Sequence, residues 1–85
     1  MIFKPGDLVE CTMTADMQNT HRETDIKKAK ILGVNQFMGC SAAYMHTDEA
    51  YTVLSVTKTG GVRLRGFAAT VSAKWLRTSD KPQYR

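Results

Sequence analysis

Two thiols and two imidazoles are the groups in this chain best suited to metal binding or nucleophilic attack: Cys11, His21, Cys40 and His46. Zinc sites usually draw pairs of ligands from one tight turn, at spacings such as Cys-x₂₋₄-Cys or His-x₃₋₅-His. Here five residues separate Cys40 from His46, and Cys11 belongs to an alternating apolar segment. The spacing therefore predicts no metal and no cofactor, with the cysteines as small buried side chains and the histidines at the surface.

A cysteine nucleophile needs an adjacent base or cation that lowers its pKa, and His21 and His46 are the candidates to activate Cys40. The residues around Cys40 show no pattern of a nucleophile elbow or an oxyanion site. Asp48 and Glu49 are adjacent, so an extended backbone would point them to opposite faces instead of pairing them. The chain also lacks the glycine-rich patterns that bind phosphates. We therefore expect a protein that is not an enzyme.

The basic residues are concentrated in the second half of the chain. Its 85 residues include 12 Lys and Arg against 8 Asp and Glu, a formal charge of +4. Residues 1–50 carry five bases and seven acids, whereas residues 51–85 carry seven bases and one acid. This asymmetry is typical of a surface for nucleic acid or an acidic partner, although a solvated face that maintains solubility gives the same pattern. The candidate residues for this surface are Lys58, Arg63, Arg65, Lys74 and Arg77.

A second candidate surface lies in residues 36–48, a segment with many small residues and no clear period. It includes two aromatic residues and two methionines, residue types that adapt well to a protein partner. The same side chains would equally serve to cover an open end of the core. The candidate residues for protein contact are Phe37, Met38, Tyr44 and Met45.

The first half of the chain is expected to consist mostly of loops. Residues 14–50 have no clear hydrophobic period, although the segment starting at Thr20 fits a capping box and Gly33 suits the end of a helix. Two alternatives stay open for residues 20–34: a short helix that ends at Gly33, or a loop or short helix followed by a strand over residues 28–34. We favour the second. The rest of this segment is expected to be an ordered loop that packs on the core.

The second half has the composition of a β-meander. Gly60 and Gly61 both tolerate the positive φ of a two-residue hairpin turn. The residues after them alternate, with Val62 and Leu64 inward and arginines outward. Trp75 is expected to reach the core from a single helical turn. The predicted elements are strands over residues 8–13, 51–57, 62–66, 67–71 and 77–78, a helical turn over 72–76 and a polar tail over 79–85.

Four segments carry a resemblance to a known fold: Phe3-Lys-Pro-Gly-Asp-Leu-Val9, Tyr51-Thr-Val-Leu-Ser-Val56, Gly60-Gly-Val-Arg-Leu-Arg-Gly66 and Ser72-Ala-Lys-Trp-Leu-Arg77. Together they resemble the Src-homology-3-like and KOW-type barrels and small bacteriophage proteins of that fold. The resemblance implies a small five-stranded Src-homology-3-like barrel, all-β or β-rich with one short helix. It implies one domain over residues 1–78, with residues 14–50 as a long inserted loop.

The same resemblance bears on binding. Members of the fold that bind polyproline carry acidic and aromatic residues in the first loop. This chain has Asp16, Glu23 and Asp25 in that loop but no aromatic residue before Phe37, so a polyproline groove is not expected. KOW-type barrels commonly contact RNA or ribosomes, and the phage proteins often bind and inhibit a host enzyme or defence protein.

These observations lead to one hypothesis of function and one alternative. We expect a non-enzymatic, phage-type interaction protein in the cytoplasm of a bacterial host, where it binds a host macromolecule such as a host or defence protein that it inhibits. The alternative is a basic module that binds RNA or DNA. A homodimer through an unpaired barrel edge is a further expectation. The sequence has no apolar run of about 18 residues that could cross a membrane and no pattern of a signal peptide.

Overall fold

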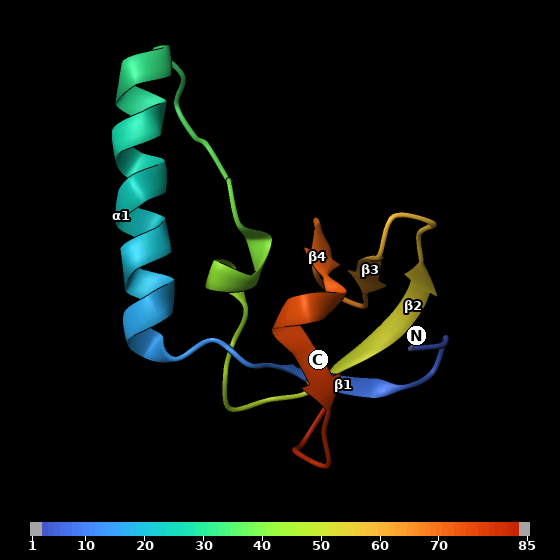
Figure 1. Ribbon diagram of the computed structural model, residues 1–85. Helices are drawn as coiled ribbons and strands as arrows, with labels where there is room; N and C mark the ends of the chain where they lie inside the picture. Colours follow the sequence, from blue (N-terminus) through green and yellow to red (C-terminus); the bar gives the residue numbers. More distant parts are fainter. Residues whose placement is uncertain (1–2, 84–85) are drawn as a thin grey trace.

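Five antiparallel strands and one long helix make up the part of the chain that the structure, a computed structural model, describes: residues 3–83. The strands follow one another in the sheet in the order β4-β3-β2-β1-β5 (Figure 1). The elements are β1 (Leu8–Cys11), α1 (Ala15–Leu32), η1 (Ser41–Tyr44), β2 (Tyr51–Val56), β3 (Gly61–Leu64), β4 (Thr70–Ser72), η2 (Ala73–Trp75) and β5 (Leu76–Thr78). The expectation of a β-rich, five-stranded protein is confirmed.

Strand β2 is shared between two parts of the sheet. Its first residues pair with β1 and its later residues pair with β3, and the register shifts between Val53 and Ser55. An irregularity of this kind bends a strand, and Figure 1 shows β2 curving between its two neighbours. Within residues 3–83, no pairing joins β4 to β5, so the sheet is open and forms no closed barrel.

The core fills the inner face of this bent sheet. Alternation along the strands buries Val9, Val53, Val62, Leu64 and Val71 almost completely, as the sequence pattern of period two requires. The inward direction predicted for Val62 and Leu64 is confirmed, and so is the one-turn helix η2 before the last strand. The β2–β3 turn differs from the prediction, because Gly61 is already the first residue of β3.

Helix α1 is the largest departure from the predicted structure. It spans 18 residues, and Thr14 caps its start by accepting a hydrogen bond from the backbone N–H of Met17. The predicted capping box at Thr20 is wrong, because Thr20 lies inside the helix. The favoured strand over residues 28–34 is also wrong, since the helix continues through residues 28–32 and ends at Leu32. The predicted cap at Gly33 is confirmed by its left-handed φ of 73°.

Polar side chains attach this helix to η1. Figure 1 shows α1 standing beside the sheet with η1, in green, between them. The buried Gln18 donates from Nε2 to the carbonyl oxygens of Ala42 (3.0 Å) and Met45 (2.9 Å). Arg22 donates from Nη1 to the carbonyl oxygen of Ala43 at 3.1 Å. These bonds give α1 direct contacts with backbone carbonyls of η1 and of the residue that follows it.

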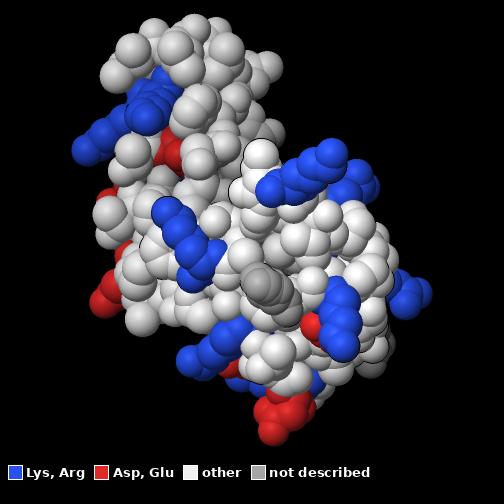
Figure 2. Space-filling view, turned by 45° about the vertical axis from the view of Figure 1, so that its right-hand side comes forward, with Lys and Arg blue, Asp and Glu red and all other residues white. Residues whose placement is uncertain are grey.

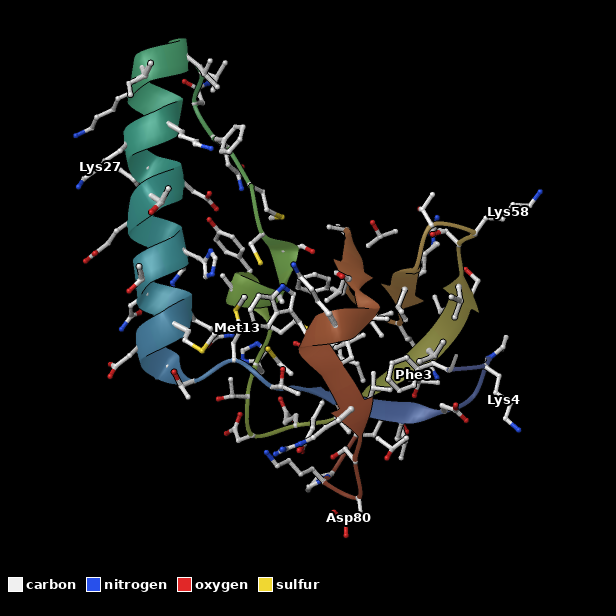
Figure 3. All side chains as sticks on the ribbon, viewed as in Figure 1. Phe3, Lys4, Met13, Lys27, Lys58 and Asp80 are labelled. Carbon is white, nitrogen blue, oxygen red and sulfur yellow. The ribbon has the colours of Figure 1, made fainter. Side chains whose placement is uncertain are left out.

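Asp25 continues the same attachment one turn further along α1. Its buried carboxylate accepts the backbone N–H of Gly39 at 3.1 Å and the hydroxyl of Tyr44 at 2.8 Å. Burial and the nearby carboxylate raise the pKa of Tyr44. Beyond Asp25 the helix extends past the rest of the fold, and Lys27 points into solvent on its outer side (Figure 3).

A buried carboxylate joins the first strand to the last segment of the chain. Glu10 in β1 accepts hydrogen bonds from Arg77 in β5 and from the hydroxyl of Ser79 at 2.9 Å, and Lys81 lies 3.1 Å from it. The bond from Arg77, with those from Ser79 and Lys81, lowers the pKa of Glu10 from 4.5 to about 2, although burial acts in the opposite direction. Residues 79–83 of the predicted tail thus contact the sheet, and residues 84–85 lie outside the described part.

This linkage predicts acid sensitivity. Because the pKa of Glu10 is lower in the folded state, its stabilisation is present above about pH 4.5 and is lost as the pH falls from 4.5 toward 2. We expect Glu10→Gln to lower the free energy of unfolding at pH 7 by about 1–3 kcal/mol, toward the lower figure because Arg77 is largely exposed. Urea unfolding followed by circular dichroism across pH 2–7 measures both effects.

The control for this prediction is Glu23→Gln, which removes an exposed carboxylate from α1. The variant should keep the wild-type pH dependence, whereas Glu10→Gln should show a flatter one between pH 4.5 and 2. Identical slopes for Glu10→Gln and the wild type in that interval would contradict the assignment.

Candidate functional site

The solvent-exposed face of β2, β3 and β4 carries two arginines, Arg63 and Arg65. Cross-strand pairing places Arg63 opposite Thr70 of β4, and the backbone N–H of Arg65 bonds to the carbonyl of Thr52 in β2. Leu54, in the neighbouring strand β2, is 48% exposed and adds an apolar side chain to this surface. We call this surface the outer face; its residues are Thr52, Leu54, Arg63, Arg65, Thr70 and Ser72.

Carboxylates are absent from the sequence that builds this face: residues 50–79 contain five bases and no acid. Among the described residues, the ion pairs both involve Glu10, one with Arg77 and one with Lys81. Arg77 therefore serves the fold, although its side chain stays 65% exposed. Figure 2 shows the basic side chains spaced over the surface with uncharged areas between them. The predicted bases outside any ion pair with a described residue are Lys58, Arg63, Arg65 and Lys74.

A hollow of about 420 Å³ opens beside the outer face, where α1, the segment before η1, β4 and η2 meet. Thr70 and Ser72 belong to both surfaces, so the outer face continues into the hollow. No carboxylate lines it. We call this cavity the hollow; its residues are His21, Gly39, Cys40, Ser41, Ala42, Thr70, Ser72, Lys74 and Trp75.

Three side chains define the chemistry of the hollow. Trp75 is half-buried, and the backbone N–H of Thr12 donates to its carbonyl oxygen at 2.8 Å. The ring of His21 meets the ring of Trp75 edge-on, with centroids 6.2 Å apart and planes at 73°. The Nζ atom of Lys74 lies 5.4 Å from the centre of the tryptophan ring. An aromatic surface, an imidazole and a free ammonium group thus share one cavity.

The structure answers whether the two cysteines and two histidines come together. His21 and Cys40 line the hollow, which the long distance between them in the sequence concealed. Cys11 is buried in the core, and burial raises the pKa of its thiol. His46 lies on the loop before β2, so the four groups do not form one site.

Most of the predicted protein-contact residues have internal roles. Met45 is 3% exposed, so its place in a contact surface is wrong: it belongs to the core under η1. Tyr44 is held by Asp25, and Phe37 lies beneath Lys28, whose Nζ is 5.5 Å from the ring centre. Met38, at 41% exposure, is the exposed member of the set.

An apolar surface that the sequence analysis did not identify lies at the far end of α1. Ile31 is 83% exposed and Leu32 is 59% exposed in the last turn of the helix. Ile26 and Val34 line a cavity of about 380 Å³ between the helix and residues 34–37. Because α1 has no apolar stripe, the sequence pattern does not reveal the length of this helix. We call this surface the helix end; its residues are Ile26, Ile31, Leu32 and Val34.

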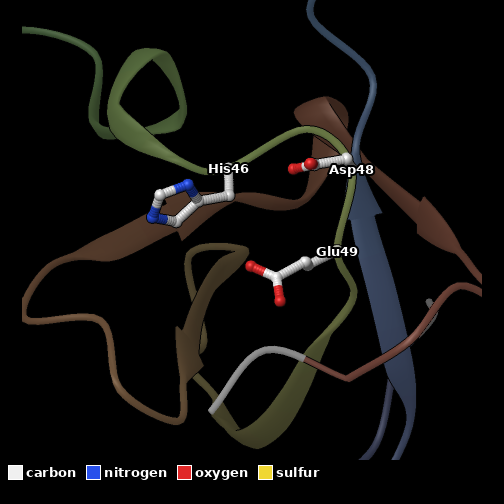
Figure 4. A group of neighbouring side chains, drawn as sticks. All are labelled: His46, Asp48 and Glu49. Carbon is white, nitrogen blue, oxygen red and sulfur yellow. The ribbon is translucent and has the colours of Figure 1, made fainter.

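Residues 46–49 form a bend that gathers three possible metal ligands. One ligand atom from each of His46, Asp48 and Glu49 lies within 4.8 Å of the others. Figure 4 shows both carboxylates pointing to the same side of the loop as the imidazole. The opposite orientation expected for Asp48 and Glu49 is wrong, because the backbone is bent and not extended. Oxygen and imidazole ligands of this kind could hold a divalent cation at the surface.

Comparison with known proteins adds no relative: no family model, no curated protein and no solved structure matches the chain. Among residues 3–83, no helix has the length and apolar character required to cross a membrane. The geometry of the outer face, the hollow and the helix end is therefore the basis for any assignment of function.

The positions of the two thiols predict very different reactivities. We expect iodoacetamide to modify Cys40 readily in the native protein, because it lines the hollow, and to modify Cys11 at least about tenfold more slowly, because a buried thiol rarely forms the thiolate. Mass spectrometry of timed reactions measures both rates. In the Cys11→Ser variant, iodoacetamide should modify Cys40 at the wild-type rate. Comparable rates at Cys11 and Cys40 in the native wild type would contradict their placement in the core and in the hollow.

Proposed function

We propose that this chain is a non-enzymatic binding protein that holds single-stranded nucleic acid on its outer face. The observation that carries the proposal is the set of basic side chains without carboxylate partners on a surface whose strands contain no acid. Arginine and lysine in such a setting neutralise phosphates and release counterions, which is the main source of affinity for nucleic acids. This was the alternative hypothesis from the sequence, and the burial of Met45 now favours it over the loop-contact hypothesis.

The spacing along β3 supports a strand-like ligand. Arg63 in β3 and Arg65 directly after it are two positions apart, about 7 Å along an extended chain, with the buried Leu64 between them. Lys58 lies on the turn between β2 and β3, and its side chain points into solvent (Figure 3). The exposed Leu54 adds an apolar contact for the face of an unpaired base.

The sheet also supports the proposed relationship to Src-homology-3-like barrels. The strand order, the strand β2 shared between two halves and the one-turn helix before β5 are consistent with that fold in an open form. In this proposal α1 and η1 replace the first loop. A bacterial host cytoplasm and a phage-type role remain predictions that depend on this relationship.

A second candidate function is binding of a host protein, with inhibition of a host or defence protein as its effect. The observation in its favour is the helix end, where Ile31 and Leu32 are both exposed in the last turn of α1. A homodimer through the edges remains a weaker prediction, because β4 and β5 have three residues each and offer short templates for pairing.

The nucleic-acid proposal is tested with the double variant Arg63→Ala/Arg65→Ala. Fluorescence anisotropy of a labelled 12-nucleotide single strand should show weaker binding at every salt concentration. The slope of log affinity against log salt should become shallower by about 1.4, since each phosphate contact on a single strand contributes about 0.7. The charge-matched control Lys27→Ala/Lys30→Ala, on α1, should bind like the wild type. Absence of binding by the wild type even at 20 mM salt would overturn the proposal.

The second candidate makes a separate prediction. Ile31→Asp and Leu32→Asp should release any protein that the wild type captures from nuclease-treated bacterial lysate, because a charge at the centre of an apolar contact is desolvated without a partner. Arg63→Ala/Arg65→Ala should capture the same protein as the wild type. If the helix-end variants retain the captured protein, the helix end is not the contact surface.

A further inference from the structure

We propose that the hollow binds a single unpaired nucleobase of the strand that lies on the outer face, with Trp75 as the stacking surface. This inference rests on the proposed function and adds that the protein binds a base of the nucleic acid as well as its phosphates. It concerns a different set of atoms, because the arginines of the outer face would contact phosphates, whereas Trp75 and His21 would contact a base.

The two rings form a corner that suits a flat ligand. Trp75 and His21 meet at 73° with centroids 6.2 Å apart, so a base that stacks on the tryptophan ring presents its edge to the imidazole. The imidazole can donate or accept a hydrogen bond at that edge. Stacking on an aromatic side chain is favourable for every base, because every base has a π-face.

Lys74 gives the hollow affinity for the phosphate attached to the base. Its ammonium group now lies 5.4 Å from the ring centre of Trp75, on a side chain exposed to solvent. A base that stacks on the ring of Trp75 would displace the ammonium group of Lys74. The long side chain of Lys74 can then turn outward and contact a phosphate oxygen. Because no carboxylate lines the hollow, no side chain there repels that phosphate.

The size and position of the hollow favour an unpaired base. A volume of about 420 Å³ is large enough for one base with its sugar. Extracting a base from a duplex costs a few kcal/mol, whereas a single strand presents its bases freely. Thr70 lines the hollow and lies opposite Arg63 across the β3–β4 pair, so a strand anchored at Arg63 reaches the hollow directly.

The test compares the binding of two single-stranded oligonucleotides, each of six nucleotides and with identical phosphates. One carries a single adenine at its third position with abasic sugars elsewhere, and the other is abasic throughout. Trp75 is the only tryptophan of the chain, so its fluorescence reports on the hollow directly. We expect the adenine strand to bind about tenfold more tightly, to quench Trp75 and to protect Cys40 from iodoacetamide, since one stacked base has an effect of this size.

Variants then locate the effect in the hollow. His21→Ala should reduce the advantage of the adenine strand about fivefold or more, because the imidazole contacts the base. Lys74→Ala should weaken the binding of both strands, because their phosphates are identical. Lys27→Ala should leave both affinities unchanged, because Lys27 lies on the outer side of α1 (Figure 3). Circular dichroism verifies that each variant is folded.

The outcomes separate the two proposals. Equal affinity for both strands, with unchanged fluorescence and unprotected Cys40, would overturn the base-binding hollow and leave phosphate binding on the outer face intact. No binding of either strand at 20 mM salt would overturn both proposals. An undiminished advantage of the adenine strand in His21→Ala would place the base away from the imidazole and would also overturn this inference.

Discussion

The attachment of α1 to η1 through polar side chains is the interaction on which the rest of the candidate site depends. Gln18, Arg22 and Asp25 lie one turn apart on the same side of the helix and bond to backbone or hydroxyl groups between residues 39 and 45. That row fixes the rotation of the helix. His21 consequently lies beside Trp75, and α1 forms one side of the hollow. A buried row of this kind is stable only when every member is satisfied, and no buried side-chain polar atom is unpaired among the described residues.

The same row explains why the sequence predicts one half of the fold better than the other. Val62 and Leu64 alternate with arginines, and that period alone identifies β3 and its buried face. Helix α1 buries Gln18, Asp25 and one small apolar residue, so it has no apolar stripe to recognise. Its ends are signalled by Thr14 and Gly33, but a cap alone does not determine the length of a helix. The tertiary partners that stabilise it are carbonyl groups, which no sequence pattern specifies.

The candidate site divides along a similar line. The outward direction of Arg63 and Arg65 follows from the alternation that buries their neighbours, so sequence alone predicts it. Sequence cannot separate Arg77 from them, because its role depends on Glu10, which lies 67 positions away along the chain and beside it in the sheet. The hollow is less predictable still, since His21, Cys40 and Trp75 come from three separate segments. A cavity at a junction exists only after those segments have packed.

That junction links ligand binding to the stability of the fold. The walls of the hollow belong to α1 and the segment before η1 on one side, and to β4 and η2 on the other. A ligand that contacts both sides binds the assembled arrangement and not the separated one, so it stabilises the docking of α1 by mass action. A helix attached by hydrogen bonds rather than a large apolar face is the element whose position such a ligand affects most. The polar attachment therefore builds the hollow and also leaves α1 responsive to what occupies it.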